Sequence, residues 1–165
     1  SEMCIRDRFY NLHNCAAVHF IEADNSSYLC SNRKDSTYIY MKNIAETYWK
    51  RKKMPIPHLL LSDYEGRNVW SHKGIVHWRG MNICMVTDGY WRNKSATNLL
   101  DIDYMYLCKG YKGEIAPLQK LFHIKRIVLD ESLGDYKSKA YKEECKTLGL
   151  DYIDISEKGS FRILL

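Results

Sequence analysis

The chain has 165 residues, of which 45% are hydrophobic and 13% aromatic, enough for one domain with a sizeable core. Its formal net charge of +5 predicts a mildly basic surface, which favours polyanions without identifying one. The longest apolar runs, 56–61 and 124–129, fall far short of the ~20 residues of a membrane helix, so we expect no span here. The 6 cysteines include no C-x-x-C pair. This argues against a zinc ribbon or a redox motif and favours free core thiols, although their number does not exclude disulfides.

The N-terminal segment 1–8 stands apart from the rest of the chain. It resembles a translated sequencing-adapter peptide, so we expect it to be non-native and to take no part in the fold. The remaining residues, 9–165, are expected to form a single domain, the C-terminal fragment of a longer membrane protein.

The first half of the chain has the alternation and the turn residues of short strands. Strands are expected at 9–12, 16–22 and 28–30, forming a small meander, and at 58–62, 68–72, 74–78 and 81–87, forming a second antiparallel sheet. A helix is predicted between the two groups, at 36–53, because its apolar residues recur at helical spacing and its last residues are basic. Pro55 and Pro57 end it.

The last third alternates strands and helices after a polar loop at 90–98. We expect strands at 104–108, 126–129, 152–154 and 161–165, and helices at 114–122 and 136–148. In the second helix the expected apolar stripe is Ala140, Tyr141, Glu144, Cys145 and Leu148, the solvated side is Lys137, Lys139, Lys142 and Lys146, and Gly149 follows the last turn. The whole pattern predicts an α/β (α+β) fold with a β-rich front and a βαβαβ back.

The segment 103–118 is the most informative: an apolar strand, a glycine-containing turn and a short predicted helix. It resembles the segment in which metallo-β-lactamase-like hydrolases carry an H-x-H-x-D-H metal motif. Here those ligand positions hold Lys109, Tyr111, Gly113 and Glu114. A hydrolytic zinc site needs about three ligands and a bound water, and only Glu114 could hold a metal. The resemblance therefore implies a degenerate metallo-β-lactamase-like half-sandwich, with mixed β-sheets and two or three packed helices, and with no metal or other cofactor.

Three groups of residues carry a second resemblance. They are FYNLHNCAAVHFI at 9–21; YLCKGYKGE at 106–114; and IVLDESL at 127–133 with EECKTLG at 143–149 and EKG at 157–159. Together they resemble the C-terminal region of ComEC-family competence proteins of the Bacteroidetes type. Where catalytic relatives have a turn with two acidic residues, this chain has NLHNCA at 11–16. The resemblance covers nearly the whole chain from residue 9. The absence of the two acidic residues places a nuclease role in doubt.

This resemblance implies a non-catalytic accessory domain of a membrane channel for DNA uptake in natural transformation, acting as a scaffold or a weak single-stranded DNA contact. Its partners would be the transmembrane channel portion of the same polypeptide and single-stranded DNA, with no small-molecule substrate. The full-length protein would lie in the cell inner membrane, with this fragment as a soluble part on the extracytoplasmic face. Two alternatives stay open: a metal-dependent nuclease or hydrolase with an atypical site, and a purely structural protein-interaction module.

The turn at 109–113 supplies the candidate nucleic-acid-binding residues, Lys109, Tyr111 and Lys112. Lysines provide charge, glycines let the backbone approach a phosphate, and Tyr111 could stack on a base. An ordinary glycine turn explains the same residues and is the simpler interpretation.

Catalytic alternatives rest on dispersed residues. A metal site could be assembled from His13, His72 and His77 with Glu114, although satisfied or surface histidines are the simpler interpretation. Cys108 is the better candidate for a nucleophile, because it follows a strand and precedes a lysine that would lower its pKa.

Overall fold

The computed structural model describes residues 63–159 without a gap, together with 8–10, 17–21, 27–31, 50–51, 53, 58–60 and 161–162. The strands form one five-stranded and one seven-stranded sheet. The helical elements include α2 (Gly134–Leu148), α3 (Ile155–Lys158) and the 3₁₀ turns η1 (Ala116–Lys120) and η2 (Glu131–Leu133). These mixed sheets and helices confirm the predicted α+β class.

The five-stranded sheet has the order β12-β1-β2-β3-β4. Its strands are β1 (Arg8–Tyr10), β2 (Ala17–Ile21), β3 (Ser27–Ser31), β4 (His58–Leu60) and β12 (Phe161–Arg162). Antiparallel pairing of β1, β2 and β3 confirms the predicted meander. However, β4 pairs in parallel with β3, so the prediction that 58–62 belongs to the second sheet is wrong. A short apolar run specifies a buried strand but not its neighbour.

Two predicted segments lie mostly outside the described residues. The helix expected at 36–53 is described only at its C-terminal end, where Lys50 and Arg51 are helical. Of the segment 1–8, only Arg8 is described, as the first residue of β1.

The seven-stranded sheet has the order β11-β10-β9-β8-β7-β6-β5. Its strands are β5 (Tyr64–Glu65), β6 (Val69–His72), β7 (Ile75–Trp78), β8 (Met81–Val86), β9 (Leu100–Leu107), β10 (Phe122–Leu129) and β11 (Asp151–Asp154). Strands β5 to β8 pair as antiparallel hairpins. The antiparallel pairing of β6, β7 and β8 was predicted, whereas β5 was not expected as a strand. Strand β8 then pairs in parallel with β9, and β9 to β11 continue in parallel. The expected middle sheet and the expected βαβαβ back are therefore one mixed sheet.

The helix predicted at 114–122 forms only in part, as the 3₁₀ turn η1 at Ala116–Lys120. Strand β10 already begins at Phe122 rather than near residue 126. In the new strand Phe122 and Ile124 are buried while His123 is exposed. This period of two belongs to a strand with one buried face, and it prevails over the local helical pattern.

Helix α2 confirms the predicted helix at 136–148 and extends it by two residues at its start. Tyr141 and Cys145 are buried, as predicted. Ala140 is exposed and Ser138 is buried instead, so the stripe is rotated from the predicted one. Gly149 has φ 68°, the left-handed conformation that ends a helix most readily at glycine. Its N–H donates to the carbonyl of Lys146, which closes the last turn.

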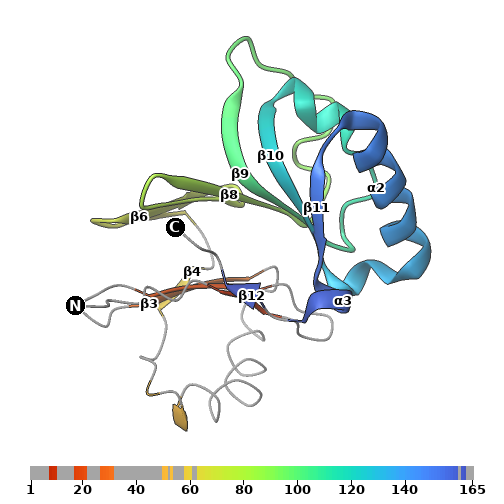
Figure 1. Cartoon of the computed structure of the whole chain (residues 1–165). Helices are drawn as coiled ribbons and strands as arrows, with labels where there is room; N and C mark the ends of the chain where they lie inside the picture. Colours follow the sequence, from red (N-terminus) through yellow and green to blue (C-terminus); the bar gives the residue numbers. More distant parts are fainter. Residues whose placement is uncertain are drawn as a thin grey trace.

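Two apolar layers hold these elements together (Figure 1). Figure 1 shows the five-stranded sheet beneath the β6–β8 part of the seven-stranded sheet, with α2 beside β11 on the outer side. Phe20 from β2 contacts Trp78 from β7 with their ring centroids 5.3 Å apart, within the layer between the sheets. Tyr141 and Cys145 of α2 pack with Ile127 and Leu129 of β10 in the outer layer.

Candidate functional site

The parallel strands β8, β9, β10 and β11 end at one edge of the sheet. Their last residues, Val86, Leu107, Leu129 and Asp154, are direct neighbours in register across the four strands. Open sheets with parallel strands bind ligands outside the carboxyl ends of those strands. The segments that follow these residues are therefore the candidates for a functional site.

The turn after β9 contains the candidate residues of the predicted DNA contact. Lys109 and Lys112 are exposed. Tyr111 is 2% exposed, and its hydroxyl donates to the carbonyl oxygen of Glu114 at 2.6 Å. Burial raises the pKa of the Tyr111 hydroxyl, and the nearby Glu144 carboxylate adds to the rise. A ring buried to this extent cannot stack on a base, so the predicted stacking role of Tyr111 is corrected here.

Helix α2 fixes this turn from the side. The Tyr141 hydroxyl donates to the Gly113 carbonyl oxygen at 2.7 Å, and the Lys137 ammonium donates to the same oxygen at 3.3 Å. The Glu144 carboxylate accepts hydrogen bonds from the backbone N–H groups of Ile115 and Ala116, both at 2.8 Å. Glu144 therefore caps the N-terminal end of η1, where Ile115 has no polar side chain to do so.

This role of Glu144 was missed because the residue was assigned to the apolar stripe of α2. The sequence contains a signal for this role: a carboxylate lies on the packed side of one helix, and the preceding helical segment lacks a capping side chain. Joining the two signals requires knowing that α2 packs against the turn.

The glycines of the turn are required by packing within the protein. A Cβ on Gly110 would lie 1.8 Å from the carbonyl oxygen of Thr87, and a Cβ on Gly113 would lie 2.4 Å from the Tyr111 hydroxyl. Real side chains never approach so closely, so both positions need glycine for the close approach of protein atoms. Approach to a phosphate is not needed to explain them.

The predicted nucleophile is inaccessible. Cys108 is 0% exposed and its Sγ lies 3.9 Å from the carbonyl oxygen of Tyr106. A reactive cysteine needs contact with solvent or substrate, which this burial denies. The prediction that Cys108 is the better nucleophile candidate therefore finds no support.

The two described histidines of the predicted metal site, His72 and His77, contact different residues. His72 contacts Asp63 at 2.8 Å, and His77 contacts Asn82 at 2.6 Å while its ring stacks on Trp70. Within the described part of the chain no three His, Cys, Asp or Glu side chains come together in a group that could hold a metal ion. The predicted assembly of His72, His77 and Glu114 is therefore wrong; its fourth member, at position 13, lies outside the described residues.

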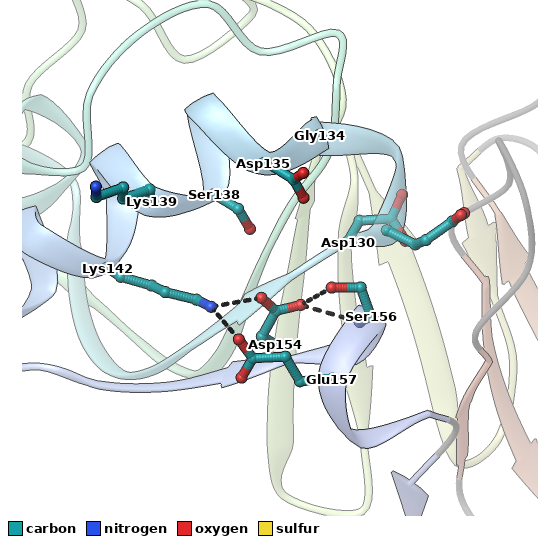
Figure 2. Close-up of a pocket in the computed structure, with 10 residues that line it drawn as sticks. Asp130, Gly134, Asp135, Ser138, Lys139, Lys142, Asp154, Ser156 and Glu157 are labelled. Carbon is teal, nitrogen blue, oxygen red and sulfur yellow. Dashed lines mark hydrogen bonds and ion pairs between the residues drawn. The ribbon is translucent and has the colours of Figure 1, made fainter.

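A pocket of about 480 Å³ lies at the ends of β10 and β11, between α2 and α3 (Figure 2). Its acidic lining residues are Asp130, Glu131, Asp135, Asp154 and Glu157, and its basic ones are Lys139 and Lys142. The Lys142 ammonium lies 2.8 Å from Asp154 and 2.6 Å from Glu157, as the dashed lines in Figure 2 show. Lys142 was predicted to lie on the solvated side of α2, but only 20% of its side chain is exposed.

Two buried carboxylates of this pocket, Asp154 and Asp130, accept hydrogen bonds. Burial alone would raise the pKa of Asp154, but hydrogen bonds from Lys142 and Ser156 outweigh it and lower that pKa. The same bonds, from Asp154 first and Glu157 second, raise the pKa of Lys142. Asp130, 1% exposed, accepts from the Tyr106 hydroxyl at 2.7 Å. The ion pairs of Lys142 with Asp154 and Glu157 hold α2, β11 and α3 together. A structural role therefore explains these charges without a bound ligand.

Comparison with known families identifies this chain. The family model of the ComEC C-terminal domain matches residues 8–165. The chain belongs to the ComEC C-terminal domain family. Membership implies a role in competence DNA uptake and a membrane-associated protein. No curated protein and no solved structure gave a match. Among the described residues of this ComEC domain, no helix is long and apolar enough to cross a membrane.

Proposed function

We propose that this chain is a non-catalytic accessory domain of a ComEC-type DNA-uptake channel, with a metallo-β-lactamase-like fold whose metal site is degenerate. The observation that carries the proposal is the closed state of the turn at 109–114. Apart from the exposed Glu114 carboxylate, its groups are exposed lysines or are engaged in bonds within the protein, and among the described residues no three His, Cys, Asp or Glu side chains converge as metal ligands do.

The positions where a metallo-β-lactamase-like hydrolase has its ligands carry groups that do not fit a metal ion here. Lys109 presents an ammonium, which repels a metal cation. The Tyr111 hydroxyl is committed to Glu114, and the Gly113 carbonyl accepts from Tyr141 and Lys137. Of these positions only Glu114 carries a carboxylate, and one carboxylate falls short of the three or so ligands that catalytic zinc requires.

The cellular location that we propose for this domain is that of a DNA-uptake channel. We place the full-length protein in the cell inner membrane and this domain on its extracytoplasmic face, next to the transmembrane portion of the same polypeptide. In that position the domain serves as a scaffold near the DNA path and needs no small-molecule substrate. The mildly basic charge of +5 supports a location beside a polyanion.

Metal content and cleavage on one sample test the proposal. The purified chain is dialysed against Zn²⁺, its metal is measured by plasma mass spectrometry, and labelled single-stranded and duplex DNA are incubated with Zn²⁺, Mn²⁺ or Mg²⁺. We expect zinc well below one ion per chain and no cleavage. Stoichiometric zinc, or metal-dependent cleavage that disappears in Glu114→Ala, would establish the nuclease alternative and overturn the proposal.

A further inference from the structure

An exposed tyrosine surrounded by cations lies on the segment that follows β8. Tyr90 is 41% exposed, and the Lys94 ammonium lies 3.4 Å from the centroid of its ring. The Lys73 ammonium, from the turn between β6 and β7, lies 5.4 Å from the same centroid. Two segments that are distant in sequence thus bring positive charge to one aromatic ring.

Tyr90 is held in place by its neighbours. Its backbone N–H donates to the Asp88 carboxylate at 2.9 Å, and the N–H of Arg92 donates to the Gly89 carbonyl at 3.0 Å, which makes a closed turn. The Tyr90 ring meets Trp91 edge to face at 4.6 Å, and Trp91 meets Phe122 of β10 in the same way at 5.2 Å. Trp91 therefore anchors the turn to the core, and Tyr90 is presented outward on a fixed support.

The same segment adjoins the turn at 109–113. Gly110 packs directly against the Thr87 carbonyl, and Arg92 lies near enough to Tyr111 for its charge to oppose the rise in the Tyr111 pKa. Lys109 and Lys112 are exposed residues of that neighbouring turn. Around Tyr90 itself, Lys73, Arg92 and Lys94 are exposed cations, and Asp88 belongs to the same turn as Tyr90.

We propose that this surface, defined by Tyr90, Lys73, Arg92 and Lys94, binds single-stranded DNA, with a base stacked on Tyr90 and the flanking phosphates on the three cations. An aromatic face among cations is the arrangement by which proteins bind single strands without reading sequence. Base stacking contributes more than an exposed cation–π contact, so a base can displace the Lys94 ammonium from the ring. The displaced ammonium is then available to a phosphate.

Single strands are favoured over duplexes because a paired base has both faces covered by its neighbours in the stack. The choice of DNA as the polyanion rests on the proposed function. The choice of Tyr90 as the stacking residue rests on its exposure and on the cations around its ring. It replaces Tyr111, the residue expected from the sequence, which is buried.

Fluorescence anisotropy of a labelled oligothymidylate tests this binding surface, measured with EDTA present across a series from about 50 to 200 mM salt. We expect binding that weakens with salt. Tyr90→Ala should weaken it by about 5- to 100-fold, the range expected for loss of one stacked base. Tyr90→Phe, which keeps the ring, should bind within about twofold of the unchanged chain, and Lys94→Ala should reduce the slope of log K against log salt by about 0.7.

Tyr152 provides a matched control. It is 37% exposed, with the Lys142 ammonium 5.8 Å from its ring, but it lies on β11, which β10 and β9 separate from β8 in the sheet. Tyr152→Ala should leave the affinity unchanged. Thermal melting of each variant checks that folding is retained.

Three results would overturn the inference: no binding of the oligonucleotide, equal affinities for Tyr90→Ala and the unchanged chain, or equal affinities for duplex and single strand. Preferential binding to anionic lipid vesicles without binding to DNA would overturn it as well. These outcomes are separate from a failure of the proposed function, which would appear as bound zinc and DNA cleavage whether or not Tyr90 affects affinity.

Discussion

Removal of the Glu144 carboxylate should destabilise the domain far more than removal of the neighbouring Glu143 carboxylate. Glu144 accepts from the N–H groups of Ile115 and Ala116 at 2.8 Å. A hydrogen bond to a charged group contributes about 1.5–3 kcal/mol. Ile115 is buried, so its N–H would be left without an acceptor, whereas Ala116 is exposed and water can replace the carboxylate there. We therefore count one bond in full and expect Glu144→Ala to lower the free energy of unfolding by about 2 kcal/mol.

Thermal and urea denaturation measure this loss. For a chain of this size about 2 kcal/mol corresponds to a fall in Tm of about 4–8 °C. Glu144→Gln keeps an acceptor oxygen and should lose only about half as much. The control is Glu143→Ala: this side chain is 64% exposed and makes one surface ion pair with Lys146, so its removal should cost under about 0.5 kcal/mol. Equal stabilities of Glu144→Ala and Glu143→Ala would refute the capping role.

Three further predictions follow from single contacts. Gly110→Ala would place a Cβ 1.8 Å from the Thr87 carbonyl oxygen, so it should cost about 3 kcal/mol or more; an unchanged urea midpoint would contradict this close approach. The lowered pKa of Asp154 means that its stabilising contribution is present above the unfolded value of 3.8 and is lost as the pH falls. Asp154→Asn should therefore destabilise the domain strongly at neutral pH and much less at about pH 3, and an equal loss at both pH values in urea denaturation would be inconsistent with the Lys142–Asp154 pair. Burial raises the pKa of the Cys145 thiol to about 11, so mass spectrometry should find Cys145 alkylated only after unfolding, and rapid alkylation of the native chain would show that the thiol is accessible.

The elements that local sequence determines were predicted well. Helix α2 is the clearest case, because its apolar residues recur within the helix itself and Gly149 marks its end. The hairpins β6–β7 and β7–β8 follow from glycine-containing turns, which join adjacent antiparallel strands. In each case the signal and the structure lie within the same twenty or so residues.

Features that depend on distant segments were not predicted. The segment 87–99 carries no turn signature that would show β8 and β9 to be parallel neighbours. Lys142 resembles a solvated lysine on its own helix, and only the arrival of Asp154 and Glu157 makes it an ion-paired residue. Tyr111 resembles an exposed turn residue until α2 covers the turn.

The candidate site illustrates the same limit. The sequence directed attention to the turn at 109–113, because the strand, the glycines and the lysines are local features. It could not show which aromatic ring near that turn would face solvent. That choice depends on Trp91, which packs on Phe122 and leaves the preceding residue, Tyr90, outside the core.

The carboxyl edge of the sheet is divided between two kinds of surface. At β10 and β11 the charges of Lys142 and Asp154 bind each other and hold α2 to the sheet. At β8 and β9 the turn is closed by bonds from α2, yet its lysines and the adjacent Tyr90 remain exposed. Lysine at position 109 and a buried tyrosine at position 111 have two consequences: an ammonium and an engaged hydroxyl do not serve as metal ligands, and the lysines leave a basic surface that a polyanion can use. The non-catalytic role that we propose and the DNA contact that we propose are therefore compatible at the same edge of this domain.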